Sequence, residues 1–210
     1  MILSFLNQKG GAGKSTLSVN VAAELAKGGA RVLLIDGDTQ GSALDWAAAR
    51  SGDPLVNVVG IPRGTIHKEL AELSKGYAHV IIDGPGRATE IVRSAILASD
   101  IVVIPVQPSP YDIWAAEVVV KMVEEALVFK PSIKPFFVIN RKISGTAIGR
   151  DVKDALERYS IPTAASEIVQ RVIFAEAVAT GQAVYELDEK SPAAAEIAAL
   201  VNELKEEFAK

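Results

Sequence analysis

A glycine-rich loop near the start of the chain constrains the fold more than any other feature. Residues 2–6 form a short apolar stretch, and a helical pattern runs from Lys14 to about Lys27. Between them stands Lys9-Gly10-Gly11-Ala12-Gly13-Lys14-Ser15-Thr16. Glycines at such a turn let successive backbone N–H groups converge on phosphate oxygens, and the helix N-terminus adds partial positive charge. The strand–loop–helix order therefore predicts a phosphate-binding loop over residues 9–16.

This loop departs from the general pattern G-x-x-x-x-G-K-S/T. Gly13, Lys14 and Ser15 match its last three positions, but Gln8 stands where the first glycine is expected. In loops of this kind the lysine bridges the β- and γ-phosphates and the hydroxyl binds Mg²⁺, roles that fall to Lys14 and Ser15. The second lysine, Lys9, is not needed to hold phosphate within its own subunit. A solvated loop lysine is the alternative interpretation of Lys9.

Apolar stretches and helical patterns alternate along the rest of the chain. Further strands are predicted at 31–35, 56–61, 79–82, 101–106, 135–139 and, briefly, 167–169, and helices at 41–50, 67–74, 89–98, 111–129, 148–159, 174–180 and 192–208. Apolar strands without alternation, each followed by a helix, indicate a parallel sheet covered on both faces. We therefore predict a doubly wound α/β fold with a mostly parallel sheet. No linker or repeat interrupts the pattern, so residues 1–210 are expected to form one domain.

The composition excludes several classes of site and partner. The 210 residues include no cysteine, which rules out disulfides, thiolate metal sites, iron–sulfur clusters and cysteine nucleophiles. The net charge is −4, whereas a dedicated nucleic-acid binder is usually basic, so any DNA contact must be a local patch. No stretch reaches the ~18 apolar residues that a membrane span needs, and no signal peptide is recognisable. A cytoplasmic location is expected.

Three aspartates follow predicted strands. Asp36 and Asp38 come after the second strand, and Asp83 ends the fourth. Because ligands of such sheets bind at the carboxyl ends of the strands, these carboxylates should gather at the phosphate site. Asp83 is placed like a Walker B aspartate that binds Mg²⁺, and Gly84 begins a loop suited to sensing the γ-phosphate. One of the Asp36/Asp38 pair could instead cap the helix that starts near Gly41.

Together these motifs resemble those of the ParA/MinD ATPases, whose phosphate loop is a deviant Walker A motif. Residues 7–16 carry that loop, and Asp36-Gly37-Asp38-Thr39-Gln40 is similar to the family's D-x-D-P-Q, with threonine in place of proline. The Walker B aspartate, residues 104–110 and Asn140-Arg141 follow in the family's order. The resemblance covers nearly the whole chain and is greatest with the small ParF-like plasmid-partition branch.

The resemblance implies a role for each motif residue. Lys9 would reach across a dimer interface to the partner's ATP, so that two ATP molecules lie between two chains. Asp38 would orient the attacking water, and Asp36 would support the Mg²⁺ shell. Asn140, beside Arg141, would read the adenine edge, although a turn asparagine is the alternative. The implied sets are Lys9, Lys14 and Asp38 for catalysis; residues 9–16 (Lys9, Gly10, Gly11, Ala12, Gly13, Lys14, Ser15, Thr16) with Asn140 and Arg141 for ATP; and Ser15, Asp36 and Asp83 for Mg²⁺.

The resemblance also implies a function, that of a ParA-type ATPase that positions or segregates a cargo. ATP would drive homodimerisation and non-specific DNA binding, placing the protein on the nucleoid, and a ParB-like or other cargo adaptor would stimulate hydrolysis. Plasmids, chromosome regions, carboxysomes and chemoreceptor clusters are all served by similar ATPases, and the chain does not identify its cargo. Candidate DNA contacts, each of which could instead be a solvated surface charge, are Arg141, Lys142, Arg150, Lys153 and Arg171.

Two other behaviours occur among proteins with this kind of phosphate loop. A membrane-binding C-terminal helix would need basic residues on its polar face, but the helix predicted at 192–208 carries mostly glutamates there, which favours a docked terminal helix and no membrane partner. A metabolic enzyme, such as a dethiobiotin-synthetase-like ATP-dependent ligase, is the alternative function. It requires a pocket for a second substrate, and no additional acidic, histidine or cysteine cluster in the sequence supplies one.

Overall fold

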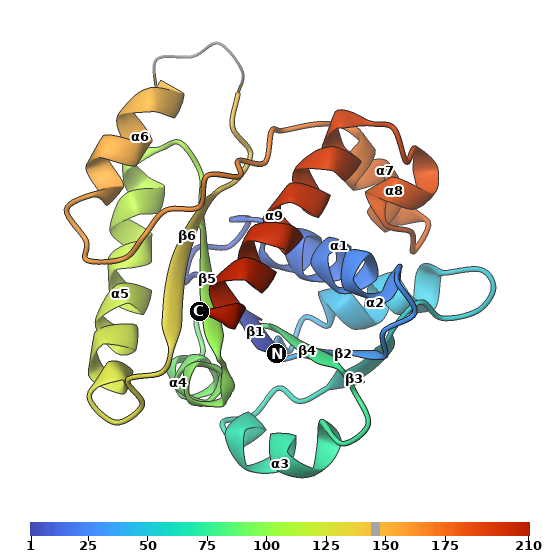
Figure 1. The fold of residues 1–210 in the computed structure, drawn as a ribbon, viewed down its shortest axis with the longest axis horizontal. Helices are drawn as coiled ribbons and strands as arrows, with labels where there is room; N and C mark the ends of the chain where they lie inside the picture. Colours follow the sequence, from blue (N-terminus) through green and yellow to red (C-terminus); the bar gives the residue numbers. More distant parts are fainter. Residues whose placement is uncertain (144–147) are drawn as a thin grey trace.

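Six parallel strands form one sheet in the computed structural model, which describes the backbone of residues 1–143 and 148–210 and the side chains of residues 1–143 and 152–210. In spatial order the sheet is β3-β2-β4-β1-β5-β6 (Figure 1). The strands are β1 (Ile2–Phe5), β2 (Val32–Asp36), β3 (Asn57–Gly60), β4 (His79–Asp83), β5 (Ile101–Val106) and β6 (Lys134–Ile139). The predicted parallel sheet is confirmed.

Helices cover both faces of this sheet, as predicted. One face carries α1 (Lys14–Ala26), α2 (Ser42–Ala49), α7 (Ile173–Ala179), α8 (Val184–Leu187) and α9 (Pro192–Ala209). The other carries α3 (Ile66–Leu73), α4 (Thr89–Ala98), α5 (Pro110–Leu127) and α6 (Ile148–Leu156). Each face has its own buried apolar cluster, and the strand side chains alternate between the two clusters, which explains why the strands read as continuous apolar runs.

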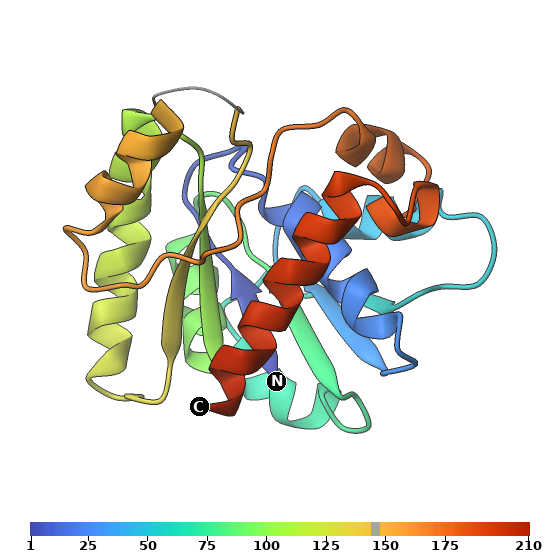
Figure 2. The ribbon, with the colours of Figure 1, turned by 45° about the horizontal axis from the view of Figure 1, so that its top comes forward.

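The central strand β1 fixes where a ligand binds. It pairs with β4 on one side and β5 on the other, and the chain leaves its carboxyl end through the glycine loop into α1. The order of strands reverses here, and open α/β sheets bind ligands at such a point. The loops that follow β2, β4, β5 and β6 begin at this same carboxyl edge of the sheet (Figures 1 and 2).

The C-terminal helix α9 is docked, as predicted, on the face of the sheet that also carries α1. Ser191 caps it by accepting a hydrogen bond from the Ala194 amide (3.2 Å), and Pro192 starts the first turn. Its apolar face is buried beside α1, with Leu200 fully covered (Figure 2). Among the described residues, no helix is both long and apolar enough to cross a membrane.

Two details of the C-terminal third differ from the prediction. Residues 167–169 form no strand: the segment makes one isolated bridge, which joins Val169 to Lys142. The helix α8 was not predicted, because four residues are too few to display a helical period.

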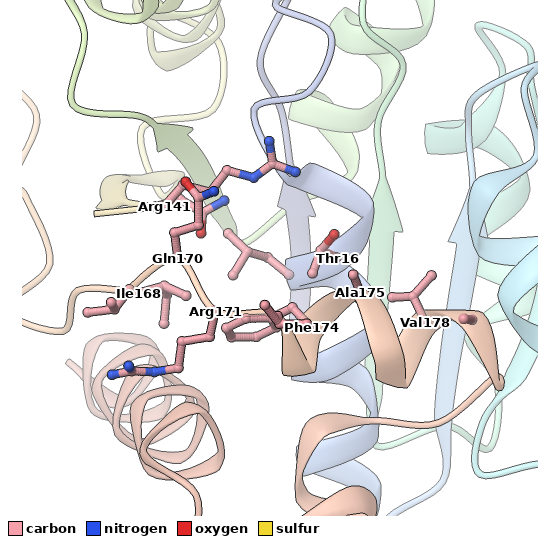
Figure 3. A pocket seen from close by; sticks show the side chains of 13 residues that line it. Thr16, Arg141, Ile168, Gln170, Arg171, Phe174, Ala175 and Val178 are labelled. Atoms are coloured by element: carbon pink, nitrogen blue, oxygen red, sulfur yellow. The ribbon is translucent and has the colours of Figure 1, made fainter. Parts of the chain in front are cut away.

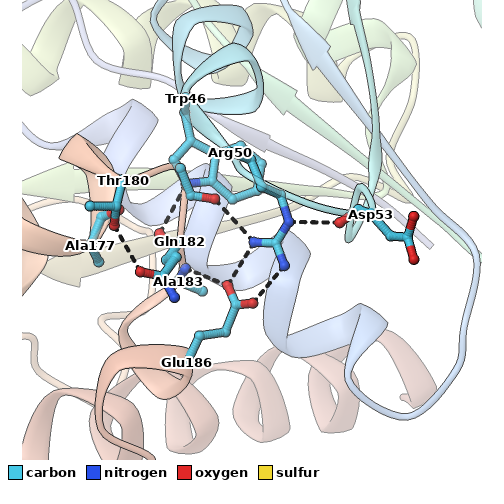
Figure 4. A network of polar contacts seen from close by, with 9 residues as sticks. Trp46, Arg50, Asp53, Ala177, Thr180, Gln182, Ala183 and Glu186 are labelled. Atoms are coloured by element: carbon cyan, nitrogen blue, oxygen red, sulfur yellow. Dashed lines mark hydrogen bonds and ion pairs between the residues drawn. The ribbon is translucent and has the colours of Figure 1, made fainter.

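A polar network joins α2 to the segment around α7 and α8 (Figure 4). The Arg50 guanidinium donates to both carboxylate oxygens of Glu186 (3.0 and 2.7 Å) and to the Gly181 carbonyl (3.1 Å). Gly181 has a φ of +66°, and a Cβ there would lie 2.3 Å from the backbone nitrogen of Arg50, so glycine is required. The indole of Trp46 also donates to the Gln182 carbonyl (3.0 Å).

Candidate nucleotide-binding site

The glycine loop forms an open cradle at the carboxyl end of β1. Gly13 has a φ of +90°, and a Cβ there would lie 2.0 Å from the Asn140 side-chain nitrogen. Gly10 and Gly11 face open space: apart from their chain neighbours, no described heavy atom comes within 4 Å of the place a Cβ would take. The side-chain amide of Gln107, after β5, donates to the Gly11 carbonyl (2.6 Å) and helps to fix the loop. The cradle therefore has room for phosphate oxygens.

Lys14 lies at the base of this cradle. It is the first residue of α1, and only 7% of its surface is exposed. Burial lowers the pKa of its ammonium, while the carboxylates of Asp83 and Asp38 act in the opposite direction. The structure therefore brings the loop lysine and two of the three predicted aspartates together.

Asp83, at the end of β4, has the most perturbed carboxyl of the site. It is fully buried, and Ser18 donates to its Oδ1 (3.3 Å), while its Oδ2 has no partner among the described residues. Burial raises the pKa of Asp83 to about 7; the nearby Ser15 hydroxyl acts against this, and repulsion from Asp36 adds to it. An unpartnered buried carboxylate oxygen fits a bound cation or its water.

The oxygen ligands at this site suit Mg²⁺ bound together with phosphates better than a metal ion held by protein side chains alone. Within the described side chains, no group of three or more histidines, cysteines or carboxylates could hold a metal. Mg²⁺ typically keeps several waters and takes one or two carboxylates plus substrate phosphates. Ser15 and Asp83 match that pattern and would hold the ion, whose charge would offset that of the phosphates.

Asp36 makes the helix-capping contacts that the sequence left open as an alternative. Its Oδ2 accepts from the amides of Ala43 (2.8 Å) and Leu44 (3.1 Å), in the first turn of α2. Its Oδ1 accepts from the Asp38 amide (3.1 Å). Asp36 also lies opposite Asp83 in the sheet register. Support of the Mg²⁺ shell by Asp36 stays a prediction. Its carboxylate already accepts three backbone hydrogen bonds, so it would act on the waters around the ion while keeping these contacts.

Asp38 and Lys9 lie at the exposed side of the cradle. Asp38 is partly exposed and accepts from the Gln40 amide (3.0 Å). Lys9 does not extend into solvent: its ammonium forms an ion pair with Asp112 of α5, a carboxylate that is fully buried. The Lys9 amide is held by the side-chain oxygen of Asn7 (2.8 Å). This pair could not be predicted from sequence patterns, because its members are 103 residues apart.

A cavity of about 730 Å³ adjoins the first turn of α1 (Figure 3). Thr16, Asn140 and Arg141, all predicted to contact ATP, line it. The Asn140 side chain donates to the Ala12 carbonyl (2.8 Å), so it ties the end of β6 to the glycine loop. Arg141 has a φ of +54°, a conformation that is uncommon for a residue with a side chain and often marks functional sites.

Sequence reasoning missed the opposite wall of this cavity. It is formed by residues 168–172 and by α7, including Phe174 and Val178. A short strand was predicted at 167–169, but nothing in the sequence associated residues 168–172 with the glycine loop. The cavity has the size and the mainly apolar lining with few polar groups that ligand sites typically show.

The basic residues proposed for DNA contact are largely paired with acids. Lys142 and Lys153 share the carboxylate of Glu167, and Arg171 is paired with Glu196 (2.5 Å). Figure 3 shows the Arg171 side chain directed toward α9, away from the Arg141 side of the cavity. Arg141 is exposed, and the side chain of Arg150 lies outside the described residues. The structure thus provides fewer unpaired cations than the sequence suggested.

Residues 3–184 match the family model described as the CobQ/CobB/MinD/ParA nucleotide binding domain. The chain belongs to this family. It is 31% identical over 206 residues to the "Maintenance of carboxysome distribution protein A" of Halothiobacillus neapolitanus, covering 96% of this chain and 95% of that protein. The suspected relation to the ParA/MinD ATPases is confirmed.

Solved structures of the family share the fold. The septum site-determining protein MinD of Pyrococcus horikoshii, solved with Mg-ADP, has a TM-score of 0.77 at 18% identity and covers 97% of this chain and 95% of its own. Cobyrinic acid a,c-diamide synthase of Mycobacterium smegmatis, solved with ADP and magnesium, has a TM-score of 0.79 at 21% identity and covers 100% and 95%. The α/β P-loop fold is confirmed, and ATP with Mg²⁺ agrees with what these family members bind.

Proposed function

We propose that this chain is a ParA-type ATPase that binds Mg·ATP, dimerises on it, and positions a cargo by cycles of dimerisation and hydrolysis. The observation that carries the proposal is the conjunction of the open glycine cradle, the buried Lys14 and the unpartnered oxygen of Asp83 at one edge of the sheet. A cation and a polyphosphate together satisfy all three.

Each residue of the site has a part in this activity. The loop amides and Lys14 bind and orient the phosphates, and Ser15 and Asp83 hold Mg²⁺. Asp38, at the rim, orients the attacking water. Lys9 acts in the partner's site, which makes turnover slow in the monomer and dependent on dimerisation. Asn140 and Arg141 bind the base in the adjoining cavity.

We infer that the dimer binds DNA weakly and without sequence preference, which would place it on the nucleoid within the cytoplasm. The candidate contacts remain Arg141, Lys142, Arg150, Lys153 and Arg171. Because phosphate contacts depend on unpaired cations, the ion pairs with Glu167 and Glu196 imply few phosphate contacts, low affinity and a shallow dependence of binding on salt.

The cargo is proposed to be a protein assembly or a DNA molecule, reached through an adaptor protein that stimulates hydrolysis. The name of the Halothiobacillus relative, which covers nearly the whole chain, favours a protein assembly such as a carboxysome. A ParB-like adaptor bound to a plasmid is the other form of the same mechanism.

The test measures oligomeric state and binding to random-sequence duplex DNA, with ATP, ADP or no nucleotide, at low and moderate salt. Dimerisation and salt-sensitive DNA binding should appear only with ATP. Lys14→Ala should lose nucleotide binding, and Lys9→Ala should bind ATP but lose dimerisation and hydrolysis. Lys75→Ala, which removes a surface lysine paired with Glu72, is the matched control and should behave as wild type.

Two results would count against the proposal. If Lys9→Ala still dimerised with ATP, Lys9 would not act in the partner's site. If the dimers bound no DNA, the protein would not use the nucleoid as its surface. Turnover that depends wholly on a small carboxylated or aminated substrate would indicate the ligase alternative instead.

A further inference from the structure

The ion pair between Lys9 and Asp112 is built on a carboxylate with no access to solvent. Asp112 is the third residue of α5, and its side chain is 0% exposed, whereas that of Lys9 is 37% exposed. Lys9 binds Oδ2, and the buried Oδ1 has no partner among the described residues. Lys9 is thus the one described side chain that neutralises this buried charge.

The surrounding contacts hold Lys9 on its own chain. The side-chain amide of Asn7 donates to the Pro105 carbonyl at the end of β5 (2.7 Å), and its oxygen accepts from the Lys9 amide. The mouth of the glycine loop is therefore fastened to β5 and α5 of the same protomer. An ammonium bound to Asp112 cannot simultaneously reach a phosphate on another chain.

We propose that Asp112 is a positioning residue that holds Lys9 in cis in the nucleotide-free protomer and competes with its insertion into the partner's nucleotide site. This rests on the proposed role of Lys9 in a dimer. When Lys9 leaves, Asp112 becomes an unpaired buried charge, which is strongly unfavourable. Dimerisation must outweigh that loss in both protomers, so Asp112 raises the concentration of ATP needed to form the dimer.

A structural role for Asp112 alone predicts something different. A carboxylate in the first turn of a helix stabilises the helix through its dipole. Removing that contribution would lower the stability of the protomer without favouring dimerisation. The two roles are therefore separated by the nucleotide dependence of assembly.

The first experiment titrates ATP against dimer formation, by analytical ultracentrifugation, for the wild type and Asp112→Asn. The isosteric change removes the charge and should lower the ATP concentration at half-maximal dimerisation by about tenfold, equivalent to 1.4 kcal/mol. Glu117→Gln, on the same helix, removes a carboxylate whose partner is the exposed Lys121, and should leave the titration unchanged.

The second experiment tests the pair itself by thermal unfolding without nucleotide. Lys9→Ala should lower Tm in the wild-type background, because it leaves Asp112 buried and unpaired. The same change should have a much smaller effect in the Asp112→Asn background. Equal shifts in both backgrounds would show that the two side chains do not interact and would overturn the proposal.

The two experiments distinguish failure of the inference from failure of the proposed function. If the wild type forms no dimer with ATP, the proposed function is wrong, while the unfolding cycle still reports on the pair. If the wild type dimerises and Asp112→Asn needs the same or more ATP, Asp112 does not compete for Lys9 and the inference is wrong.

Discussion

Single carboxylates at the carboxyl edge of the sheet are buried with one oxygen that has no partner among the described residues. Asp83 is the clearest case, and it leads to a prediction for the protein without ligands. Asp83→Asn removes a buried charge and should raise the free energy of unfolding at pH 8 by about 1–3 kcal/mol. The same variant should lose the stabilisation that Mg·ADP gives the wild type. Urea unfolding with and without Mg·ADP measures both.

The control for that experiment is Asp53→Asn, which changes an exposed aspartate in the loop after α2. It should alter neither quantity measurably. If Asp83→Asn lowered the stability of the ligand-free protein, the carboxylate would have a stabilising partner that its unsatisfied oxygen does not indicate.

Which of these residues the sequence could predict depends on how far apart in the chain their partners lie. Lys14 and Ser15 belong to one contiguous loop, and Asp83 ends an apolar strand, so motif and position suffice. The partners of Asp36 were foreseen as an alternative, since the helix it caps begins a few residues later. Asp112 was not foreseen, because only the folded chain brings α5 against the loop.

At the scale of elements, α2 is fastened to α8 by a partly buried ion pair. Burial raises the pKa of Glu186, but hydrogen bonds from Arg50 and the Ala183 amide outweigh this, so its folded pKa lies below the ordinary 4.5. A carboxyl group whose pKa is lower in the folded protein than in the unfolded protein stabilises the fold at pH values above its unfolded-state pKa. This stabilisation is lost as the pH falls through its folded-state pKa. Glu186→Gln should therefore cost about 0.5–1.5 kcal/mol at pH 7 and much less near pH 3.

Urea unfolding at the two pH values tests this, with Glu189→Gln as the control. Glu189 pairs with Lys27 on the surface, so its replacement should leave the stability unchanged at both. A loss of equal size at pH 7 and pH 3 in Glu186→Gln would mean that packing, not charge, accounts for the contact.

The same scale shows what sequence periodicity can and cannot identify. Six strands and the long helices were predicted because each repeats one period or one apolar run over enough residues. The helix α8 and the extended segment 168–172 are held instead by contacts with distant parts of the chain, such as the Asn20 side chain that accepts from the Val184 amide (2.9 Å). Residues 168–172, which line the cavity, are placed by such contacts, for example the Ile168 amide that donates to the Ile139 carbonyl (2.9 Å).

For the whole molecule, the proposed DNA binding would depend on the arrangement of surface charge. Glu167 neutralises Lys142 and Lys153, so Glu167→Gln should increase the affinity of the ATP-bound dimer for duplex DNA several-fold. Each additional phosphate contact should steepen the dependence of log K on log salt by about 0.9. Fluorescence anisotropy at several salt concentrations measures both.

Glu157→Gln provides the comparison, because it removes the same charge from an exposed site nearby. If both variants gained affinity equally, net charge alone would explain the change. If neither did, Lys142 and Lys153 would not contact DNA.

We retain the proposal that residues 1–210 form one domain, because both apolar clusters share one sheet. Leu200→Ala on α9 should then lower the stability of the entire molecule by about 2–5 kcal/mol while unfolding remains a single transition. Phe208→Ala, at a half-exposed position of the same helix, should have little effect. Circular dichroism and tryptophan fluorescence, followed together in urea, would reveal separate transitions if α9 melted independently.

Residues Met1 and Lys210 lie together at the edge of the sheet opposite the glycine loop (Figures 1 and 2). The Met1 ammonium donates to the Ala78 carbonyl before β4, and the Glu207 carbonyl accepts from Lys134 at the start of β6. The length of the strands, roughly 15–20 Å, separates this edge from the cradle. A fluorescent protein fused through a short spacer at residue 210 would thus stand clear of the glycine loop, so that live-cell imaging could follow the protein with its nucleotide site unobstructed.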